Sequence, residues 1–140
     1  MKFFCQTIHR FIIAGCALFL FPVDILAATY QVTQVATGLG IPWGMSFQSE
    51  NEILFTERKG RLGIVNIESG EVNYLSGLPE IIANGQGGFM DVAKPTNNEI
   101  ADWTYFTYVK PIDAAGNGET TLARAHISKD GIFDWQDLLV

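Results

Sequence analysis

A glutamine set among glycines is the first place where residue types and spacing in this sequence could do chemistry. It lies in Gly85-Gln86-Gly87-Gly88. The amide of Gln86 can donate and accept hydrogen bonds, which is enough to orient a carbonyl or a hydroxyl without adding charge. The neighbouring glycines let the backbone approach a flat ligand closely. The plainer interpretation is a glycine-rich turn whose glutamine is only solvated.

Several acidic positions could also act, but each has an ordinary structural interpretation. Asp91 opens a predicted strand, and aspartates at such positions usually accept hydrogen bonds from backbone amides. Glu57 and Arg58 end a strand before a hairpin turn, where we expect a local ion pair or a turn-stabilising role. The stretch Asp113–Glu119 has some of the oxygens of a calcium loop but lacks its third-position oxygen and its distal glutamate, so we expect a hairpin tip.

After residue 28 the sequence contains one histidine, His126. No second histidine and no convergent carboxylate lie near it in the sequence, whereas a catalytic base needs a pocket and a partner. We therefore expect His126 to lie on the face of a strand. The sequence has no Walker loop, no Gly-x-Ser-x-Gly elbow and no His-Glu-x-x-His motif.

The composition excludes several classes of protein. With 48% hydrophobic and 17% charged residues, the 140-residue chain is globular rather than disordered, collagen-like or coiled-coil. After residue 28 there are seven basic and fourteen acidic side chains and no cysteine. A disulfide scaffold, a cysteine-ligated metal and a thiol nucleophile are excluded there. The acidic balance argues against binding nucleic acid.

The first 28 residues predict a signal peptide. Lys2 and Arg10 precede an apolar run over residues 11–21, and Leu26-Ala27-Ala28 supplies small residues for cleavage. The apolar run is too short to span a bilayer. Cleavage would deliver a protein without a membrane span to the periplasm or the outside. Lipid attachment at Cys16 and an uncleaved anchor remain as alternatives.

Short strands are the elements that would position these residues. From residue 29 onward, alternating apolar segments separated by turn residues indicate an all-β fold. The predicted strands are Tyr30–Val35, Trp43–Phe47, Ile53–Thr56, Leu62–Ile67, Val72–Leu75, Phe89–Ala93, Trp103–Tyr108, Thr121–Ile127 and Ile132–Leu138. Trp43 and Trp103, near strand starts, are expected to pack between sheets.

The strands form an internal repeat. The aligned pairs are Gly44–Phe47 with Gly88–Asp91, Phe55–Lys59 with Phe106–Lys110, and Leu62–Ile67 with Leu122–Ile127, with a longer loop at Pro111–Thr120 in the second copy. Four strands in about 40–50 residues is the blade period of a β-propeller. Two blades do not close a ring, and the chain ends in apolar Leu138-Leu139-Val140. We therefore expect residues 29–140 to be the N-terminal part of a larger propeller domain.

Four motifs carry a resemblance to a family. They are Ile41-Pro42-Trp43-Gly44-Met45-Ser46-Phe47, the segment Ile53–Leu62 containing Thr56-Glu57-Arg58-Lys59-Gly60, Gly77-Leu78-Pro79, and Gly85–Ala93. In order and spacing they resemble the start of the glucose/sorbosone dehydrogenases, which are soluble, periplasmic, six-bladed β-propellers. The resemblance runs from about Val35 to Leu139. The sequence departs from the family at Lys94-Pro95-Thr96-Asn97-Asn98, where an Asp-Pro-rich stretch is usual.

The resemblance implies an enzyme that uses pyrroloquinoline quinone (PQQ) and calcium. Family members oxidise aldoses at C1 to lactones and pass the electrons to a respiratory acceptor. Of the family's pocket residues only Gln86 maps onto this chain, where it would contact the quinone and the sugar. The catalytic histidine and the calcium sites are expected beyond residue 140, so we expect this chain alone to be inactive. Alternatives are a non-catalytic exported propeller that acts as a binding scaffold, and a nonfunctional truncated product.

Overall fold

The structure, a computed structural model, describes residues 30–96 and 102–140. The chain divides into two units, Met1–Val32 and Thr33–Val140. In the first unit the described residues, 30–32, form neither helix nor strand. The predicted signal peptide, with Cys16, lies outside the described residues and stays a prediction. Asn97 and Asn98 of the segment that departs from the family also lie outside them.

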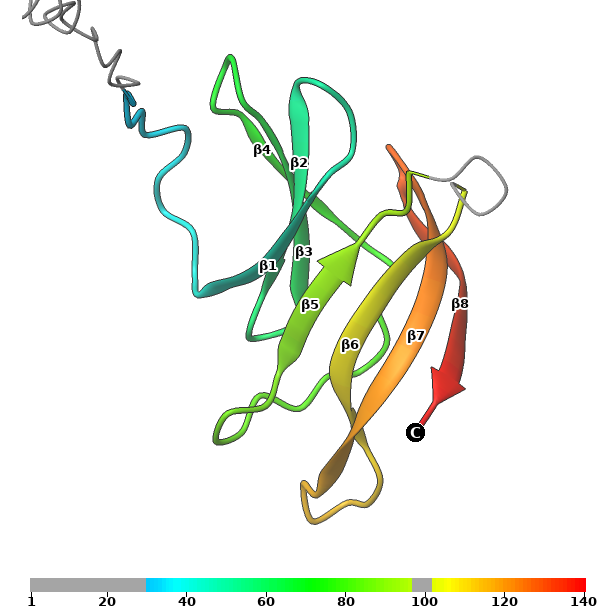
Figure 1. Ribbon diagram of the computed structural model, residues 1–140. Coiled ribbons are helices and arrows are strands. Elements are labelled where there is room, and N and C mark those ends of the chain that lie inside the picture. Colours follow the sequence, from blue (N-terminus) through cyan, green and yellow to red (C-terminus); the bar gives the residue numbers. More distant parts are fainter. Residues whose placement is uncertain (1–29, 97–101) are drawn as a thin grey trace, which may run out of the picture. The chain divides into compact units, whose positions relative to one another are not determined.

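The second unit contains two four-stranded antiparallel sheets (Figure 1). The first sheet consists of β1 (Pro42–Phe47), β2 (Glu52–Glu57), β3 (Arg61–Asn66) and β4 (Val72–Leu75). The second consists of β5 (Phe89–Ala93), β6 (Thr104–Pro111), β7 (Gly118–Ser128) and β8 (Gly131–Leu139). In both sheets each strand pairs with the next along the chain. The predicted all-β fold with two four-stranded units is confirmed.

Strand register confirms two of the three repeat alignments. Thr56 pairs with Leu62 in the first sheet as Thr107 pairs with Leu122 in the second, so β2 and β3 correspond to β6 and β7 as predicted. The alignment of β1 with β5 is wrong by three residues. Met45 lies opposite Phe55, and the residue opposite Phe106 is Val92, so Met45 corresponds to Val92 and not to Phe89. The irregularities in pairing of β1 and β5 lie at equivalent positions, so the error comes from matching Gly44 with Gly88, which do not occupy equivalent positions.

The strand predictions fail at Tyr30–Val35, which alternates in sequence but forms no strand. An alternating segment becomes a strand only where a neighbouring strand accepts and donates its backbone hydrogen bonds. The other predicted strands form with small differences in their bounds. The largest difference is at the predicted loop 111–120, where pairing continues as far as Pro111 and Gly118. The hairpin tip is therefore only residues 112–117.

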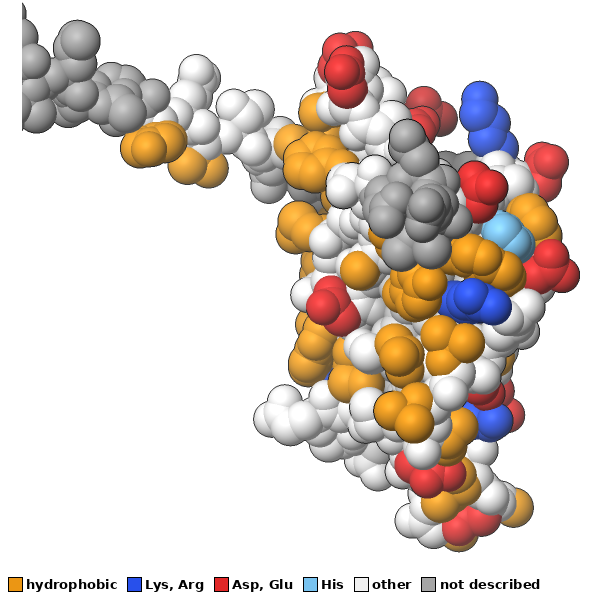
Figure 2. Space-filling model, turned by 45° about the vertical axis from the view of Figure 1, so that its right-hand side comes forward, with side chains coloured by type: hydrophobic (Ala, Val, Ile, Leu, Met, Phe, Trp, Pro, Cys, Tyr) orange, Lys and Arg blue, Asp and Glu red, His pale blue; other side chains and the backbone are white. Residues whose placement is uncertain are grey.

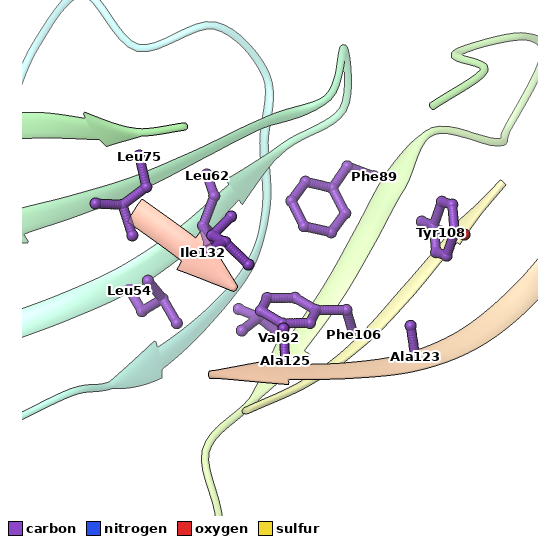
Figure 3. Close-up of a cluster of buried hydrophobic side chains, with 10 residues drawn as sticks. All are labelled: Leu54, Leu62, Leu75, Phe89, Val92, Phe106, Tyr108, Ala123, Ala125 and Ile132. Carbon is purple, nitrogen blue, oxygen red and sulfur yellow. The ribbon is translucent and has the colours of Figure 1, made fainter. Parts of the chain in front are cut away.

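Most of the buried apolar side chains lie between the two sheets (Figure 3). The first sheet contributes Leu54, Leu62 and Leu75, and the second contributes Phe89, Val92, Phe106, Tyr108, Ala123, Ala125 and Ile132. Trp135 packs against this cluster, with its ring centroid 5.1 Å from that of Phe106. The tryptophans predicted to pack between sheets lie elsewhere. Trp43 is 44% exposed, and Trp103 stacks on His126 outside this core.

Polar contacts also join the sheets. The Thr56 hydroxyl on β2 donates to the carbonyl of Met90 on β5 at 2.5 Å and accepts from the amide of Gly44 on β1 at 2.9 Å. The Lys94 amide, just after β5, donates to the Ser46 hydroxyl on β1 at 3.0 Å. These bonds place β1 and β5 side by side and fix the segment that enters the second sheet.

Within residues 30–96 and 102–140, no helix is both long enough and apolar enough to cross a membrane.

Candidate functional site

Gln86 lies in a tight turn on the segment that joins the two sheets. The Gly87 amide donates to the carbonyl of Asn84 at 2.8 Å, which closes the turn around Gln86. Gly85 has a φ of 53°, a left-handed conformation that glycine adopts at little cost. The side chain of Gln86 is exposed. The turn therefore presents the Gln86 amide to its surroundings. This fits both predicted interpretations, an amide that orients a ligand and an amide that is only solvated.

Arg58 binds this turn from the end of β2. Its Nε donates to the carbonyl of Gly87 at 3.1 Å, and its Nη2 donates to the carbonyl of Gly85 at 2.5 Å. The guanidinium thus binds the carbonyls on both sides of Gln86. The sequence predicted only a local role for Arg58, yet its partners lie 27 and 29 residues away. Main-chain carbonyls have no signature in a sequence, so this contact could not have been predicted from residue types.

A cavity of about 350 Å³ adjoins the Gln86 turn. Asn84 and Gly85 from the turn line one part, and Val109 of β6 lines another. Ile82, the hairpin-tip residues Gly116 and Asn117, and Gly118 at the start of β7 line the rest. The lining residues are uncharged, and the side chain of Asn84 offers hydrogen bonds to a polar ligand, whereas the amide groups of Asn117 are bonded to Asp113.

Asp91 is held by the backbone, as predicted. Its Oδ1 accepts from the amide of Val92 at 2.9 Å, and its own amide donates to the Thr107 hydroxyl at 3.0 Å. Asp91 lies in the middle of β5 rather than at its start. It lines a separate cavity of about 90 Å³ and is not among the residues lining the cavity beside Gln86.

Glu57 forms a local ion pair, one of the two roles predicted for it, and the partner is Arg61. The carboxylate is 1% exposed. It accepts hydrogen bonds from Tyr74 Oη at 2.6 Å, the Gly40 amide at 2.8 Å and Arg61 Nε at 2.6 Å. Burial alone would raise the pKa of Glu57, but the donors from Tyr74, Gly40 and Arg61 outweigh it and hold this pKa below its ordinary value. A buried carboxylate that is charged near neutral pH and bonded to three donors fits a structural role.

His126 lies on a strand face, as predicted. Its ring centroid is 3.8 Å from that of Trp103, and its Nδ1 is hydrogen-bonded to the carbonyl of Asp102 at 2.9 Å. Figure 2 shows the histidine among hydrophobic side chains with a cationic side chain beside it. His126 is eight residues beyond Gly118 along β7, roughly 26 Å in an extended strand, and so lies far from the cavity beside Gln86.

Asp113 lies in a hairpin tip, as predicted, but the last two residues of the predicted stretch, Gly118 and Glu119, belong to β7. Asp113 Oδ1 accepts from the amides of Ala115 and Asn117, both at 3.0 Å, and Oδ2 accepts from Asn117 Nδ2 at 2.6 Å. Both carboxylate oxygens are thus used to shape the turn. Hydrogen bonds from the Asn117 side chain and backbone keep the pKa of Asp113 below its ordinary value. Among the described residues, no three acidic, histidine or cysteine side chains gather as a metal site would require.

Comparison with known proteins gives one family. The family model for glucose/sorbosone dehydrogenases matches residues 39–139. An uncharacterised protein of Synechocystis is 33% identical over 114 residues, which cover 76% of this chain and 27% of that protein. The aldose sugar dehydrogenase YliI of Escherichia coli is 38% identical over 66 residues, which cover 46% of this chain and 18% of that enzyme. The chain thus spans about a quarter or less of the length of these relatives.

Solved structures agree with this comparison. A glucose dehydrogenase superimposes with a TM-score of 0.69 at 25% identity, covering 79% of this chain and 32% of its own. The soluble aldose sugar dehydrogenase of E. coli, in its apo-form, superimposes with a TM-score of 0.63 at 26% identity. The match covers 72% of this chain and 30% of the E. coli chain. The PQQ-bound aldose sugar dehydrogenase of Streptomyces coelicolor shares the fold, with a TM-score of 0.66 at 18% identity. The match covers 77% of this chain and 32% of the Streptomyces chain. The two sheets are accordingly two blades of a β-propeller.

Proposed function

The chain belongs to the glucose/sorbosone dehydrogenase family, and from this premise we propose that it provides the first two blades of an exported, PQQ-dependent dehydrogenase that oxidises an aldose at C1 to the lactone. The observation that carries the proposal is the family match over residues 39–139, which includes the Gln86 turn. The aldose sugar dehydrogenase of E. coli supports the substrate class. The PQQ-bound Streptomyces protein, which has the same fold, is consistent with the cofactor.

The described residues fit one part of the contact that PQQ needs. PQQ is a planar quinone with three carboxylates, and when bound it accepts the two electrons removed from the sugar. The exposed amide of Gln86 suits a quinone carbonyl or a sugar hydroxyl. The guanidinium of Arg58 is already bonded to two carbonyls of the turn, and the cavity beside it has an uncharged lining. The lining of this cavity therefore supplies no cation for the PQQ carboxylates.

In this proposal Gln86 binds and orients, and it moves no proton. A glutamine amide has no ionisable group near neutral pH, so the general base that removes the C1 hydroxyl proton must be another residue. The proposed histidine base and calcium ligands belong to parts of the protein beyond residue 140. The first two blades alone are then inactive, and the electron acceptor is a respiratory carrier.

The test of the function uses the protein as its gene encodes it, supplied with PQQ and calcium. We expect it to reduce a redox dye when glucose or another aldose is added, and to change the absorbance spectrum of the quinone on binding. If the quinone binds but no aldose supports dye reduction, the proposed reaction is wrong. If the quinone does not bind at all, the non-catalytic scaffold becomes the better account.

Export is proposed from residues 1–28 alone. N-terminal sequencing of protein recovered from the periplasm is expected to begin near residue 28 or 29. Recovery of the uncleaved chain in the cytoplasm would contradict the proposal, and a lipid-modified N-terminus at Cys16 would favour the lipoprotein alternative.

Gln86→Ala tests the role assigned to the turn. Loss of a hydrogen bond between neutral groups is expected to lower kcat/KM for the aldose about tenfold without changing stability. Gln34→Ala, which truncates an exposed glutamine outside every strand, is the matched control and should behave as the unmodified protein. Equal kinetics for the two variants would remove Gln86 from the site.

A further inference from the structure

We propose that Arg58 is a positioning residue whose guanidinium holds the Gln86 turn in one conformation and so aims the Gln86 amide. The proposal rests on the proposed function only for what Gln86 contacts. The clamp itself is seen in the two hydrogen bonds from Arg58 to the carbonyls of Gly85 and Gly87. Arg58 does not touch the substrate in this account, since it acts through the backbone on either side of Gln86.

Arg58 is a rigid anchor because its own backbone is bound on both sides. Its amide donates to the carbonyl of Ile41, just before β1, at 2.9 Å, and its carbonyl accepts from the amide of Phe89 on β5 at 2.9 Å. The residue thus lies between the first strands of the two blades. A planar guanidinium also presents its donors in a fixed fork, so less freedom is lost when it binds two acceptors than with a flexible ammonium.

The turn needs such an anchor because its own structure constrains it little. Both flanks are bonded to Val109 of β6, which accepts from the Ile82 amide at 3.0 Å and donates to the Gly88 carbonyl at 2.9 Å, but between them only one backbone hydrogen bond, from Gly87 to Asn84, closes the turn. Three of its residues are glycines, which have the widest choice of backbone conformations. Without the guanidinium, Gly85, Gln86 and Gly87 could exchange among several conformations. Only some of these conformations would present the amide in the same direction.

Close packing of the turn against Arg58 supports the same conclusion. A Cβ added at Gly88 would lie 2.8 Å from Arg58 Cγ and would also collide with the Arg58 carbonyl oxygen. A Cβ added at Gly87 would lie 2.7 Å from Val109 Cγ2. The glycines therefore let the backbone approach β2 on one side and β6 on the other. This close approach brings the two carbonyls within reach of the guanidinium.

The experiment compares Arg58→Met, Arg58→Lys and the control Lys59→Met in the protein as its gene encodes it. Methionine keeps an apolar stem and removes every donor, whereas lysine keeps the charge and can donate to only one carbonyl well. Lys59 is the exposed neighbour in the same hairpin, and its removal changes the net charge equally. Hydrogen exchange of amides 84–88 is measured by mass spectrometry, together with the thermal midpoint and the kinetics on an aldose.

We expect Arg58→Met to speed exchange of the Gly87 amide, which donates to Asn84 in the closed turn, about tenfold or more, because the turn opens more often once two charge-assisted hydrogen bonds are lost. Arg58→Lys should recover part of the protection, and Lys59→Met should match the unmodified protein. The kcat/KM of Arg58→Met should fall about tenfold, by the same reasoning as for Gln86→Ala. In the Gln86→Ala background, Arg58→Met should cost less than about twofold more, since both changes remove the same contact.

Unchanged exchange of amides 84–88 in Arg58→Met would overturn the proposal, whatever the activity. A rise in exchange no larger than that of β2 and β6 would also overturn it, since this is only general loss of stability. Faster exchange with unchanged kinetics would leave the clamp intact but show that Gln86 is not used. That outcome counts against the proposed function rather than against the role of Arg58. Additive losses in the double variant would show that Arg58 acts by another route.

Discussion

Glu57 illustrates at the scale of one residue how a buried charge becomes favourable. Removing a carboxylate from water is costly unless donors replace the lost solvation. Tyr74, the Gly40 amide and Arg61 supply those donors. The lowered pKa of Glu57 indicates that the folded state stabilises the charged carboxylate relative to the protonated one. The folded state therefore loses this stabilisation when the carboxylate is protonated.

Glu57→Gln is expected to reduce the free energy of unfolding by about 2 kcal/mol at pH 7, since Arg61 loses its partner and an amide replaces the charged acceptor. A group whose folded pKa lies below its unfolded pKa stabilises the fold above the unfolded value and loses this effect as the pH falls through the folded value. The difference in the free energy of unfolding between the unmodified protein and Glu57→Gln should therefore be largest above pH 5 and become smaller below pH 4.5. Urea unfolding at a series of pH values measures it.

The control for this prediction is Glu68→Gln, which neutralises an exposed glutamate in the turn after β3. It should change the free energy of unfolding by less than about 0.5 kcal/mol at every pH. A difference between Glu57→Gln and the unmodified protein that stays constant from pH 7 to pH 3 would contradict the assignment of a charged Glu57.

Sequence reasoning about single residues succeeded where partners are local and failed where they are distant. The Glu57 ion pair and the Asp113 turn could be predicted because their partners lie within four residues. Arg58 could not, because it binds carbonyls 27 and 29 residues away. The position of Gln86 in a turn followed from its glycine neighbours. What Gln86 contacts depends on residues outside the described part of the chain.

At the scale of strands, β8 is tied to β6 across the strand between them. Tyr108 Oη on β6 donates to Asp137 Oδ1 on β8 at 2.9 Å, and Lys110 Nζ donates to Asp137 Oδ2 at 2.7 Å. Ala123 of β7 pairs with Asp137 and is fully buried. Its small side chain leaves room for a tyrosine to cross β7. The second blade therefore has a cross-link that its backbone pairing alone does not provide.

Tyr108→Phe is expected to lower the free energy of unfolding by about 1–2 kcal/mol near neutral pH by removing a hydrogen bond to a charged acceptor. Burial of the phenol, with the hydrogen bond to Asp137, raises the pKa of Tyr108 to about 12 from 10.0. A group with a raised folded pKa stabilises the fold below the unfolded pKa and loses this effect as the pH rises through the folded one. The difference in the free energy of unfolding between the unmodified protein and Tyr108→Phe should therefore decrease as the pH rises from 10 to 12.

Tyr105→Phe is the matched control, because it removes the hydroxyl of a half-buried tyrosine on the same strand. Its stability should follow that of the unmodified protein across this alkaline range. If Tyr108→Phe and Tyr105→Phe gave the same pH dependence, the tie between β6 and β8 would not depend on the Tyr108 hydroxyl.

The strands themselves were the most predictable elements, for a reason visible in β4 and β5. Both have the bounds that the sequence predicts, since turn residues flank them closely. Bounds were wrong where a hairpin continues through turn-like residues, as at Pro111 and Gly118. The alignment of β1 with β5 was also wrong, because it relied on a shared glycine and the two glycines do not occupy equivalent positions in the pairing.

At the scale of the whole molecule, packing between blades matters as much as packing within them. The face between the two described blades is filled by the core cluster (Figure 3). Other apolar side chains remain exposed, with Met45 at 67% and Phe47 at 66% on β1, and Phe133 at 50% on β8. Propeller blades bury both of their faces against neighbours. We expect further blades to cover these side chains in a longer protein.

Thr56 tests how much one polar contact contributes to joining the blades. Its side chain is fully buried, and its hydroxyl bonds the Gly44 amide and the Met90 carbonyl. Thr56→Val keeps the shape, removes both bonds and is expected to lower the free energy of unfolding by about 2 kcal/mol.

Thr104, which is 1% exposed, is the matched control because its Oγ1 has no hydrogen-bond partner among the described residues. Thr104→Val should be neutral or stabilising, since it removes a buried hydroxyl that gains nothing from folding. Urea unfolding of both variants measures the difference, and equal effects would mean that the hydrogen bonds of Thr56 contribute nothing to joining the blades.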